Sequence, residues 1–245
     1  MSKLAFIFPG QGAQKAGMGK DFYENSETAR SFFDQAQKIL DFDLKEMCFG
    51  EHEELNLTEY TQPCMVSVCL AIVQELKKRG INPDITAGLS LGEYAAVAAA
   101  GGMNELDAIK LVRRRGILMQ STVPAGEGAM AAVLGLDAKK IEEILESFEN
   151  VWIANYNCPG QIVITGLTNE VQQASLALKE AGAKRVVELK VSGPFHSQLL
   201  KPAGEALLKE MESMSFSTLQ VPYVANATAE IVTDSKKIST FFAKG

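Results

Sequence analysis

Residues 85–102 read ITAGLSLGEYAAVAAAGG and carry the strongest fold signal in this chain. A short apolar run predicts a strand over Ile85–Leu89, and the small-residue stretch after Gly92 predicts a buried helix. Between them, residues 88–92 fit the pattern G-x-S-x-G, whose glycines permit a sharp turn that exposes the serine oxygen. The order of strand, turn and helix favours an α/β domain with Ser90 as a nucleophile over a chance glycine–serine turn.

Predicted strands and helices continue on both sides of this stretch. A strand over Lys3–Phe8 ends at a Pro-Gly turn, and helical patterns cover about 27–40, 61–79 (with Gly80 after its end) and 105–119. Beyond the linker-like residues 123–128 (VPAGEG), the expected elements lie at 129–136, 138–148, 151–157, 161–167, 170–181 and 185–191. Their order, β-α-β-β-α-β, is that of a ferredoxin-like domain, in which two helices cover one face of an antiparallel sheet.

After this segment the helical pattern resumes over about 199–214, followed by a strand-like stretch at 221–226 and a last helix from about Asp234. We therefore expect a large α/β domain with a parallel sheet, formed by residues 1–126 and 193–245. A small ferredoxin-like domain, residues 127–192, is expected to interrupt it. The cleft between the two domains is the default place for a ligand.

Composition narrows the function classes. The 245 residues include 24 Lys and Arg against 30 Asp and Glu, a net charge of −6, which argues against nucleic-acid binding. The four cysteines form no C-x-x-C pair, so we expect free thiols and no structural metal. No stretch approaches the roughly 20 apolar residues of a membrane span, and Pro9-Gly10 interrupts the apolar N-terminus too early for a signal peptide. We expect a cytoplasmic protein.

A serine nucleophile needs a base, and the chain offers two histidines. His52 lies in a charged, surface-like stretch. His196 follows Gly193-Pro194-Phe195 at the return from the inserted domain, where the backbone is restricted and an aromatic ring can exclude water. We therefore select His196 as the base, with a structural histidine as the alternative. The order serine then histidine matches α/β-hydrolases, but no aspartate between them stands out as a third member.

Stabilisation of an oxyanion requires two N–H donors. The N–H group after the nucleophile, here that of Leu91, is the usual first donor. The Gly10-Gln11-Gly12 turn after the first strand is expected to supply the second, from Gln11, because parallel strands place their carboxyl ends side by side. The same glycine run lacks the glycine and the Ser or Thr that dinucleotide-binding and P-loop motifs need.

Two further groups of polar residues are candidates for substrate binding. Arg113-Arg114-Arg115 lies in an otherwise apolar helical pattern, and an inward arginine beside an acyl-serine would pair with a substrate carboxylate; Arg115, next to Gly116, is the choice, against a solvated basic face. The segment 155–161 (NYNCPGQ) combines a Pro-Gly turn with amide side chains that could face a ligand. Spacing alone does not separate these amides from ordinary hairpin residues.

Five segments in this order closely resemble the malonyl-CoA:acyl carrier protein transacylases of bacterial type II fatty acid synthesis. They are FPGQGAQKAGMG (8–19), GLSLGEYAA (88–96), RRRGILMQ (113–120), NYNCPGQIVI (155–164) and SGPFHS (192–197). The resemblance runs through essentially the whole chain, and the five motifs together are highly specific.

The resemblance implies a ping-pong transfer in which Ser90 takes a malonyl group from malonyl-CoA, with His196 as the base, and passes it to the pantetheine thiol of acyl carrier protein. It implies Gln11 and Leu91 as the oxyanion hole, Arg115 as the residue that binds the malonyl carboxylate, and no permanently bound cofactor. The substrate-lining residues that it implies are Asn155, Asn157 and Gln161. We expect a monomer that binds neither nucleic acid nor membrane.

The sequence departs from the family pattern in two places. Many members carry histidine where this chain has Leu89, a position that does not hold the base. Members also typically continue for several dozen residues past the position of Gly245, with a glutamine whose backbone carbonyl orients the catalytic histidine, so we expect a shortened C-terminal part of the large domain. A serine esterase or hydrolase, and a non-catalytic CoA- or acyl-carrier-binding module, are the alternative functions.

Overall fold

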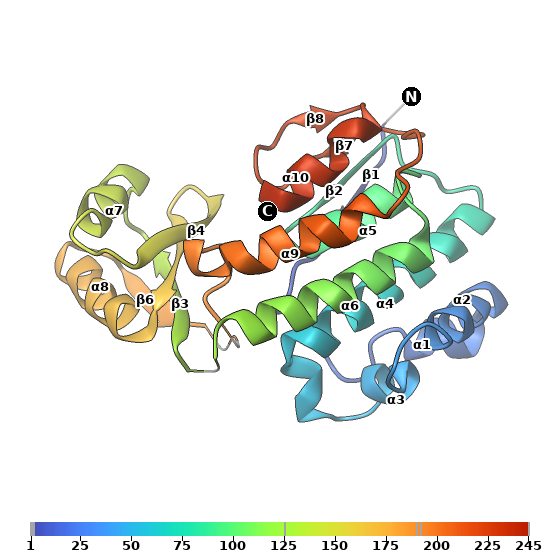
Figure 1. Cartoon of the computed structure of the whole chain (residues 1–245), viewed down its shortest axis with the longest axis horizontal. Coiled ribbons are helices and arrows are strands. Elements are labelled where there is room, and N and C mark those ends of the chain that lie inside the picture. The colour runs from blue at the N-terminus through green and yellow to red at the C-terminus, as the bar shows by residue number, and fades with distance from the viewer. Residues whose placement is uncertain (1–2, 125, 190, 192, 245) are drawn as a thin grey trace. The chain divides into compact units, whose positions relative to one another are not determined.

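The computed structural model describes residues 3–124, 126–189, 191 and 193–244, and the chain divides into two compact units (Figure 1). The first unit comprises Met1–Leu118 and Gly204–Gly245, and the second comprises Met119–Ala203. Each unit is described by itself. In the described part of the chain, no helix is long and apolar enough to cross a membrane.

The first unit is built on a four-stranded sheet with the strand order β1-β2-β7-β8. Strand β1 (Ala5–Phe8) pairs in parallel with β2 (Ile85–Gly88), which pairs in parallel with β7 (Tyr223–Val224). Strand β8 (Ile231–Val232) adds to β7 in the antiparallel direction. The chain is therefore a mixed α/β protein with parallel sheet elements, and the carboxyl ends of β1 and β2 lie at the same edge of the sheet.

Helices pack around this sheet. Helix α5 (Gly92–Ala99) is buried at all eight positions, which explains its composition of small apolar residues, and it contacts β1, β2 and α4 (Thr58–Lys78). Gly80 adopts a φ of 76° just after α4 ends, as the sequence predicts. The other helices of this unit are α1 (Lys20–Asn25), α2 (Glu27–Gln37), α3 (Leu44–Phe49) and α10 (Ile238–Lys244), with 3-10 turns at Glu53–Asn56 and Ser235–Lys237. Helices α6 (Glu105–Thr122) and α9 (Lys201–Glu212) have residues in both units, and the 3-10 turn Gln198–Leu200 belongs to the second unit.

Four short elements have no counterpart in the sequence-based expectations: α1, α3, the 3-10 turn Glu53–Asn56 and β8. None exceeds six residues, too short for a hydrophobic period to show. Capping determines where α3 begins, because the Asp43 side chain accepts hydrogen bonds from the backbone N–H groups of Lys45 and Glu46. Such a cap can be read from sequence only when the helix itself is suspected.

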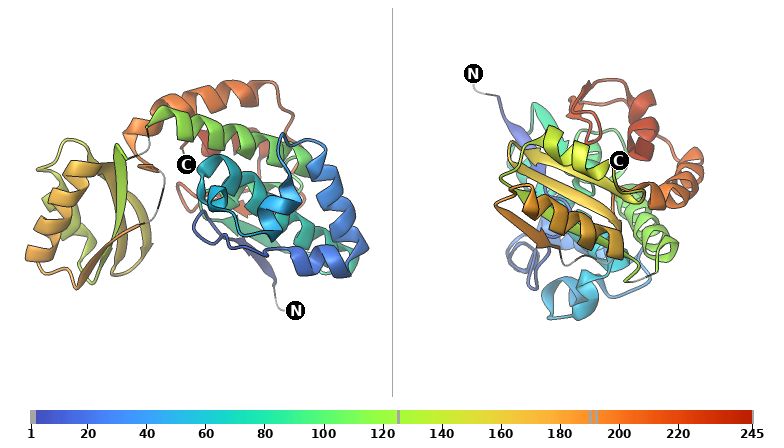
Figure 2. Two further views of the ribbon diagram at one scale, coloured as in Figure 1. Left: turned by 90° about the horizontal axis from the view of Figure 1, so that it is seen from below. Right: turned by 90° about the vertical axis from the view of Figure 1, so that its left-hand side faces the viewer.

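The second unit is an antiparallel sheet with the strand order β4-β5-β3-β6. Its elements are β3 (Gly128–Leu134), α7 (Ala138–Leu145), β4 (Val151–Cys158), β5 (Gln161–Leu167), α8 (Thr168–Glu180) and β6 (Arg185–Glu188). Both helices lie on one face of the sheet, as the two views of Figure 2 show. The predicted element order is thus present, with each bound within three residues of the expected one.

Side chains along β3 alternate between two separate cores. Ala129, Ala131 and Val133 join the core beneath α7 and α8. Met130 and Ala132 point to the other face, where they pack with Val163 and Phe195 and with the half-buried Met119 and Leu200. This second core draws residues 119–126 and 193–203 into the second unit, whereas the sequence placed the domain boundaries at 126/127 and 192/193.

Candidate active site

The turn that carries Ser90 is fixed by close backbone contacts between β1, β2 and α5. The Leu89 N–H donates to the Phe8 carbonyl at 3.1 Å. A Cβ on Gly88 would lie 2.0 Å from the Gly92 carbonyl carbon, and a Cβ on Gly92 would lie 2.4 Å from the Phe8 oxygen. Both positions of the G-x-S-x-G pattern therefore exclude any side chain, and Ser90 itself takes a left-handed φ of 48°.

Ser90 is half-buried, and three of its polar groups have partners in the first unit. Its N–H donates to the Asn226 Oδ1 at 2.8 Å, and its carbonyl accepts from the Glu93 N–H at 3.1 Å. Its Oγ lies 3.4 Å from the Nη2 of Arg115, a long hydrogen bond. The backbone is thus held on both sides of the Cα, and the hydroxyl faces a cation.

Arg115 lies on α6 and is only 7% exposed. Its guanidinium stacks over the Tyr94 ring at 5.4 Å, and among the described residues it forms no ion pair within 4.0 Å. Helix α6 approaches α4 closely here, because a Cβ on Gly116 would lie 2.7 Å from the Glu59 Cα. The structure therefore brings the predicted arginine to the predicted serine and leaves its charge without a carboxylate partner in the described chain.

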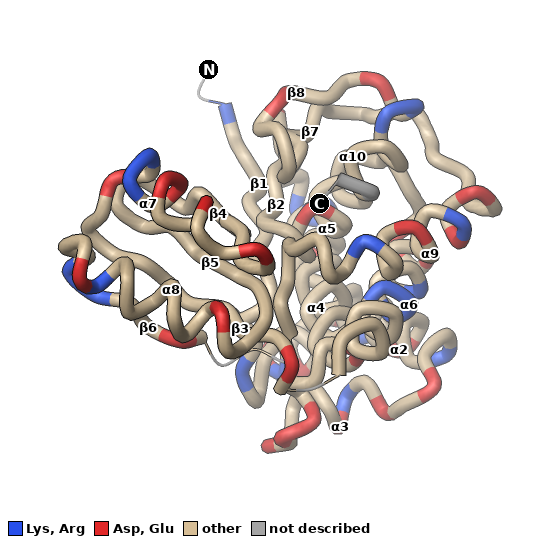
Figure 3. The backbone as a smooth tube through the Cα atoms, turned by 60° about the vertical axis from the view of Figure 1, so that its left-hand side comes forward, with Lys and Arg blue, Asp and Glu red and all other residues tan. Residues whose placement is uncertain are grey.

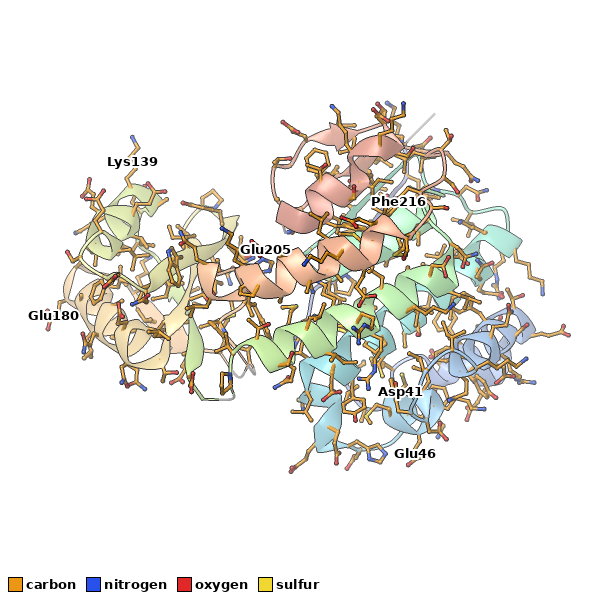
Figure 4. The ribbon with its side chains drawn as sticks, in the orientation of Figure 1. Asp41, Glu46, Lys139, Glu180, Glu205 and Phe216 are labelled. Atoms are coloured by element: carbon orange, nitrogen blue, oxygen red, sulfur yellow. The ribbon has the colours of Figure 1, made fainter. Side chains whose placement is uncertain are left out.

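The other two arginines of the triplet have different surroundings. Arg113 is also buried, which the expectation of one inward arginine did not anticipate, and it pairs with Asp41 and Glu59. Arg114 is exposed and pairs with Glu210 on α9. Asp41 lies in the segment between α2 and α3 (Figure 4). Of the three arginines, only Arg115 forms a hydrogen bond with Ser90, and its role in binding a substrate carboxylate stays a prediction.

Glu93 places a second buried ionisable group near Ser90. Its carboxyl is 2% exposed and accepts the Asn226 N–H at 3.0 Å. Burial raises the pKa of Glu93 to about 7, although the Asn226 N–H and the Arg115 charge oppose the shift. Burial also raises the pKa of the neighbouring Tyr94 to about 12.

The two N–H groups expected to stabilise an oxyanion lie on adjoining turns. A Cβ on Gly10 would lie 2.9 Å from the Leu89 carbonyl oxygen, so the Gly10-Gln11-Gly12 turn adjoins the Ser90 turn. The side chain of Gln11 donates to the Thr58 Oγ1 at 3.2 Å, which orients this residue. Within the part of the chain that the structure describes, neither the Gln11 nor the Leu91 backbone N–H donates a hydrogen bond. Both donors are therefore available to a ligand oxygen.

His196 lies in the second unit, whereas Ser90, Gln11, Leu91 and Arg115 lie in the first. Like Ser90, it takes a positive φ, here 56°, in a non-glycine residue. Phe195 beside it is 8% exposed and packs in the second core, and Ser197 donates its hydroxyl to the Pro194 carbonyl at 2.7 Å. That His196 acts as the base for Ser90 stays a prediction. His52, the other histidine, lies 3.0 Å from Glu46.

The three predicted amides lie around the β4–β5 hairpin. Gly160, with a φ of 80°, forms the turn, so the Pro-Gly pair has its ordinary hairpin role. Asn155 pairs with Val163 across the strands and so lies on the sheet face of the second core, which also contains Phe195. Gln161 is on the same face, 3.8 Å from the Cys158 sulfur, and Asn157 is exposed at a bulge. Asn155 and Gln161 thus share a face with the segment that carries His196.

Glu93 and Asn226 were not predicted from the sequence. Each forms a hydrogen bond with the Ser90 backbone, and the Asn226 N–H also donates to the Glu93 side chain. The signal for Glu93 was present, because it is the one charged residue in the small-residue helix after the serine. Asn226 had no such signal beyond its place at the end of a strand-like stretch. No group of three His, Cys, Asp or Glu side chains suited to a metal ion occurs among the residues described.

Comparison with known proteins defines the class first. Residues 5–243 match the family described as acyl transferase domain, and the chain belongs to that family. It is 46% identical over 243 residues to a malonyl CoA-acyl carrier protein transacylase of Bacillus subtilis (strain 168), a match that covers 97% of this chain and 77% of the relative.

Solved structures show the same similarity. An acyl carrier protein S-malonyltransferase from Vibrio cholerae O1 biovar eltor matches with a TM-score of 0.95 and 40% identity, covering 99% of this chain and 81% of that one. A malonyl-transacylase in complex with its type II PKS acyl-carrier protein also matches with a TM-score of 0.95, at 38% identity, covering 99% of this chain and 80% of the other.

Proposed function

We propose that this chain transfers a malonyl group from malonyl-CoA to the pantetheine thiol of acyl carrier protein, as a step of fatty acid synthesis. The observation that carries the proposal is a buried arginine, Arg115, that has no carboxylate partner among the described residues and lies 3.4 Å from the hydroxyl of Ser90. A buried cation is costly unless an anion accompanies it, and malonyl is an acyl group that brings its own carboxylate. The names of the 46%-identical relative and of the solved neighbours support the same reaction.

In the first half-reaction, the Ser90 Oγ attacks the thioester carbonyl while His196 takes the hydroxyl proton. The carbonyl oxygen becomes an oxyanion that accepts hydrogen bonds from the N–H groups of Gln11 and Leu91. The intermediate then breaks its C–S bond, and the CoA sulfur leaves with the proton from the imidazolium. A malonyl-serine ester remains on Ser90.

In the second half-reaction, the same groups act on a thiol. His196 removes the proton from the pantetheine thiol of acyl carrier protein, and the sulfur attacks the ester carbonyl. The Ser90 oxygen is the leaving group and recovers its proton from His196. Throughout, Arg115 holds the malonyl carboxylate, and the amides Asn155, Asn157 and Gln161 line the path of the substrate. No permanently bound cofactor takes part, because the thioester and the pantetheine arrive with the substrates.

We also propose the finer fold assignment for the two units. The parallel β1-β2-β7 strands with a serine turn between β2 and α5 support an α/β-hydrolase-like core. The strand order β4-β5-β3-β6, with two helices on one face, supports a ferredoxin-like inserted domain. In this arrangement the serine comes from the core and the histidine from the end of the insert.

Acyl carrier protein is acidic, so we propose that basic residues of the second unit receive it. Acidic and basic residues both occur along α7 (Figure 3). Lys184, Arg185 and Lys201 are the candidates; Lys190 lies outside the described residues. Charge reversal at these positions is expected to raise the KM for carrier protein at low salt and to leave that for malonyl-CoA unchanged. An unchanged KM for carrier protein would refute this docking surface.

Intact-mass measurement tests the proposed function. The chain mixed with malonyl-CoA is expected to gain one malonyl group, Ser90→Ala is expected to gain none, and added holo acyl carrier protein is expected to remove the group. A serine hydrolase, the first alternative, would release free malonate without carrier protein. A non-catalytic binding module, the second, would form no adduct, and that result would contradict the proposal.

A further inference from the structure

Ser90, Asn226 and Glu93 form a closed ring of hydrogen bonds in the first unit. The Ser90 N–H donates to the Asn226 side chain at 2.8 Å, and the Asn226 N–H donates to the Glu93 side chain at 3.0 Å. The Glu93 N–H completes the ring by donating to the Ser90 carbonyl at 3.1 Å. Each residue donates once and accepts once, so the peptide groups on both sides of the Ser90 Cα are fixed.

The ring acts on a backbone conformation that an L-residue rarely adopts. Ser90 has a φ of 48°, in the left-handed region that favours glycine. Glycine would relieve the strain but has no hydroxyl to react. A serine in this conformation persists only where its surroundings hold it there, and the ring supplies two of the bonds that do so.

The fold delivers Asn226 to this position through the sheet. Strand β7 pairs in parallel with β2, with Ala87 opposite Val224, so the residues after β7 emerge beside the turn that follows β2. The Ala225 N–H bonds to the Glu230 carbonyl, and the Ala229 N–H bonds to the Ala225 carbonyl. The hairpin between β7 and β8 therefore fixes the backbone from which the Asn226 side chain reaches Ser90.

Glu93 has no evident packing reason to be a carboxylate. It belongs to a helix that is buried at every position, and it forms no ion pair within 4.0 Å among the described residues. Arg115, Tyr94 and Tyr223 are the titratable groups that influence it or are influenced by it. Among the residues that the structure describes, its side chain has one hydrogen bond, the bond from the Asn226 N–H, which an apolar residue would leave unmade.

We propose that Asn226 and Glu93 are positioning residues that hold Ser90 in the conformation needed for attack. The Asn226 side chain acts on the Ser90 N–H directly, and the Glu93 side chain acts by accepting the Asn226 N–H and so orienting Asn226. The inference rests on the proposed role of Ser90 as nucleophile. It adds to that role a second set of side chains that touch neither malonyl nor CoA.

Four single variants test the proposal by single-turnover malonylation followed by intact mass. Asn226→Ala and Glu93→Ala are expected to slow malonylation at least tenfold, while the malonyl-CoA concentration at half-saturation stays within twofold because Arg115 is untouched. Glu93→Gln keeps an acceptor oxygen and is expected to stay within twofold of the unaltered rate. Asn82→Ala, which removes an exposed asparagine of the same unit, is the matched control and is expected to change neither quantity.

The double variant Asn226→Ala/Glu93→Ala shows whether the two residues act together. If both work through one ring, the double variant is expected to be no slower than the slower single variant. Additive losses would overturn the proposal. So would an unchanged rate per folded molecule in Asn226→Ala accompanied only by a lower melting temperature. If Asn226→Ala does not fold, the malonylation rates of Glu93→Ala and Glu93→Gln are compared instead. An equal loss of rate in both variants would overturn the proposal.

A reagent that needs no malonyl group separates this inference from the proposed function. A fluorophosphonate reacts with an activated serine hydroxyl whatever the natural acyl group is. If the unaltered chain forms no malonyl adduct, the proposed function fails, and the rates of fluorophosphonate labelling still test the ring. Labelling of Asn226→Ala at least tenfold slower than the unaltered chain supports the positioning role, and equal labelling rates overturn it.

Discussion

Arg113 and Arg115 lie two positions apart on α6, and both are buried, but their faces of the helix differ. Arg113 bonds to both oxygens of Asp41 and to Glu59, and it stacks over the rings of Phe42 and Tyr60. Arg115 stacks over one ring and bonds weakly to a hydroxyl. On one face of α6 the arginine is neutralised by carboxylates of the protein, and on the other face no carboxylate among the described residues lies within 4.0 Å of the arginine.

The carboxyl groups near the two arginines show the same contrast. The hydrogen bond from Arg113 lowers the pKa of Asp41, so this carboxyl is charged and paired. Burial raises the pKa of Glu93 to about 7, and the more distant Arg115 lowers it only in part. Burial of a cation does not by itself identify a ligand site. The absence of a bonded carboxylate in the described chain, together with a nearby nucleophile, is the better criterion.

Arg115→Ala is expected to have the largest effect. It should lower kcat/KM for malonyl-CoA at least 100-fold, about 3 kcal/mol, because the substrate carboxylate would be buried without its charged partner. The preference should shift from malonyl towards acetyl, since acetyl carries no carboxylate. Intact mass after competition between malonyl-CoA and acetyl-CoA measures this shift. An unchanged preference between malonyl and acetyl would contradict the proposal that Arg115 binds the malonyl carboxylate.

Glu93→Gln is expected to change how stability depends on pH. A carboxyl whose pKa rises from 4.5 to about 7 on folding stabilises the protein below pH 4.5, and this contribution, roughly 3 kcal/mol, is lost as the pH rises to 7. Glutamine does not titrate, so the stability of the variant lacks this dependence on pH. The free energy of unfolding of the variant minus that of the unaltered chain should therefore be more positive at pH 8 than at pH 5. Urea denaturation at both pH values measures the difference. A difference independent of pH would show that Glu93 titrates normally.

Arg113→Ala should lower stability and leave chemistry intact. It removes one partner of a buried ion-pair cluster, for which we expect a loss of about 2 kcal/mol in the free energy of unfolding of the first unit. Asp41 is largely exposed, which reduces the penalty for its unpaired charge. The malonylation rate per folded molecule should stay within twofold. A loss of rate comparable to that of Arg115→Ala would contradict the proposal that only Arg115 acts on the substrate.

Arg114→Ala should have the smallest effect and serves as the control for both other arginines. Its ion pair with Glu210 is exposed to water, and such pairs contribute about 0 to 1 kcal/mol. We expect a change in the free energy of unfolding below about 0.5 kcal/mol and no change in acyl preference. A larger loss of stability would mean that the contact between α6 and α9 depends on this pair.

Much of the fold followed from sequence because its signals are local. The serine turn could be predicted from two glycines, and the structure shows that both lie in van der Waals contact with other backbone. The β4–β5 hairpin followed from Pro159-Gly160, and the bounds of β5 agree with the expectation at both ends. These features depend on residues adjacent in the chain, so a single sequence contains them.

Other features depend on partners far away in the chain. Nothing in the arginine triplet shows that Arg113 meets Asp41 or that Arg115 meets Ser90, because those contacts are set by the packing of α6 against α4. Asn226 reaches Ser90 only because β7 pairs with β2. The second core of the second unit likewise joins Met119 to Phe195, which lie far apart in the chain. Contacts between residues far apart in the chain cannot be predicted from local sequence patterns.

The pairing of β2 with β7 also has a consequence for the order in which the protein is made. The whole second unit is translated between Ser90 and Asn226, so it can fold as a contiguous segment while the sheet of the first unit still lacks its third strand. A nascent chain that stops before residue 223 would hold the reactive hydroxyl without the side chain that anchors its backbone. The hydrogen bond between the Ser90 N–H and Asn226 therefore forms only after the segment that follows the second unit has joined the sheet of the first unit.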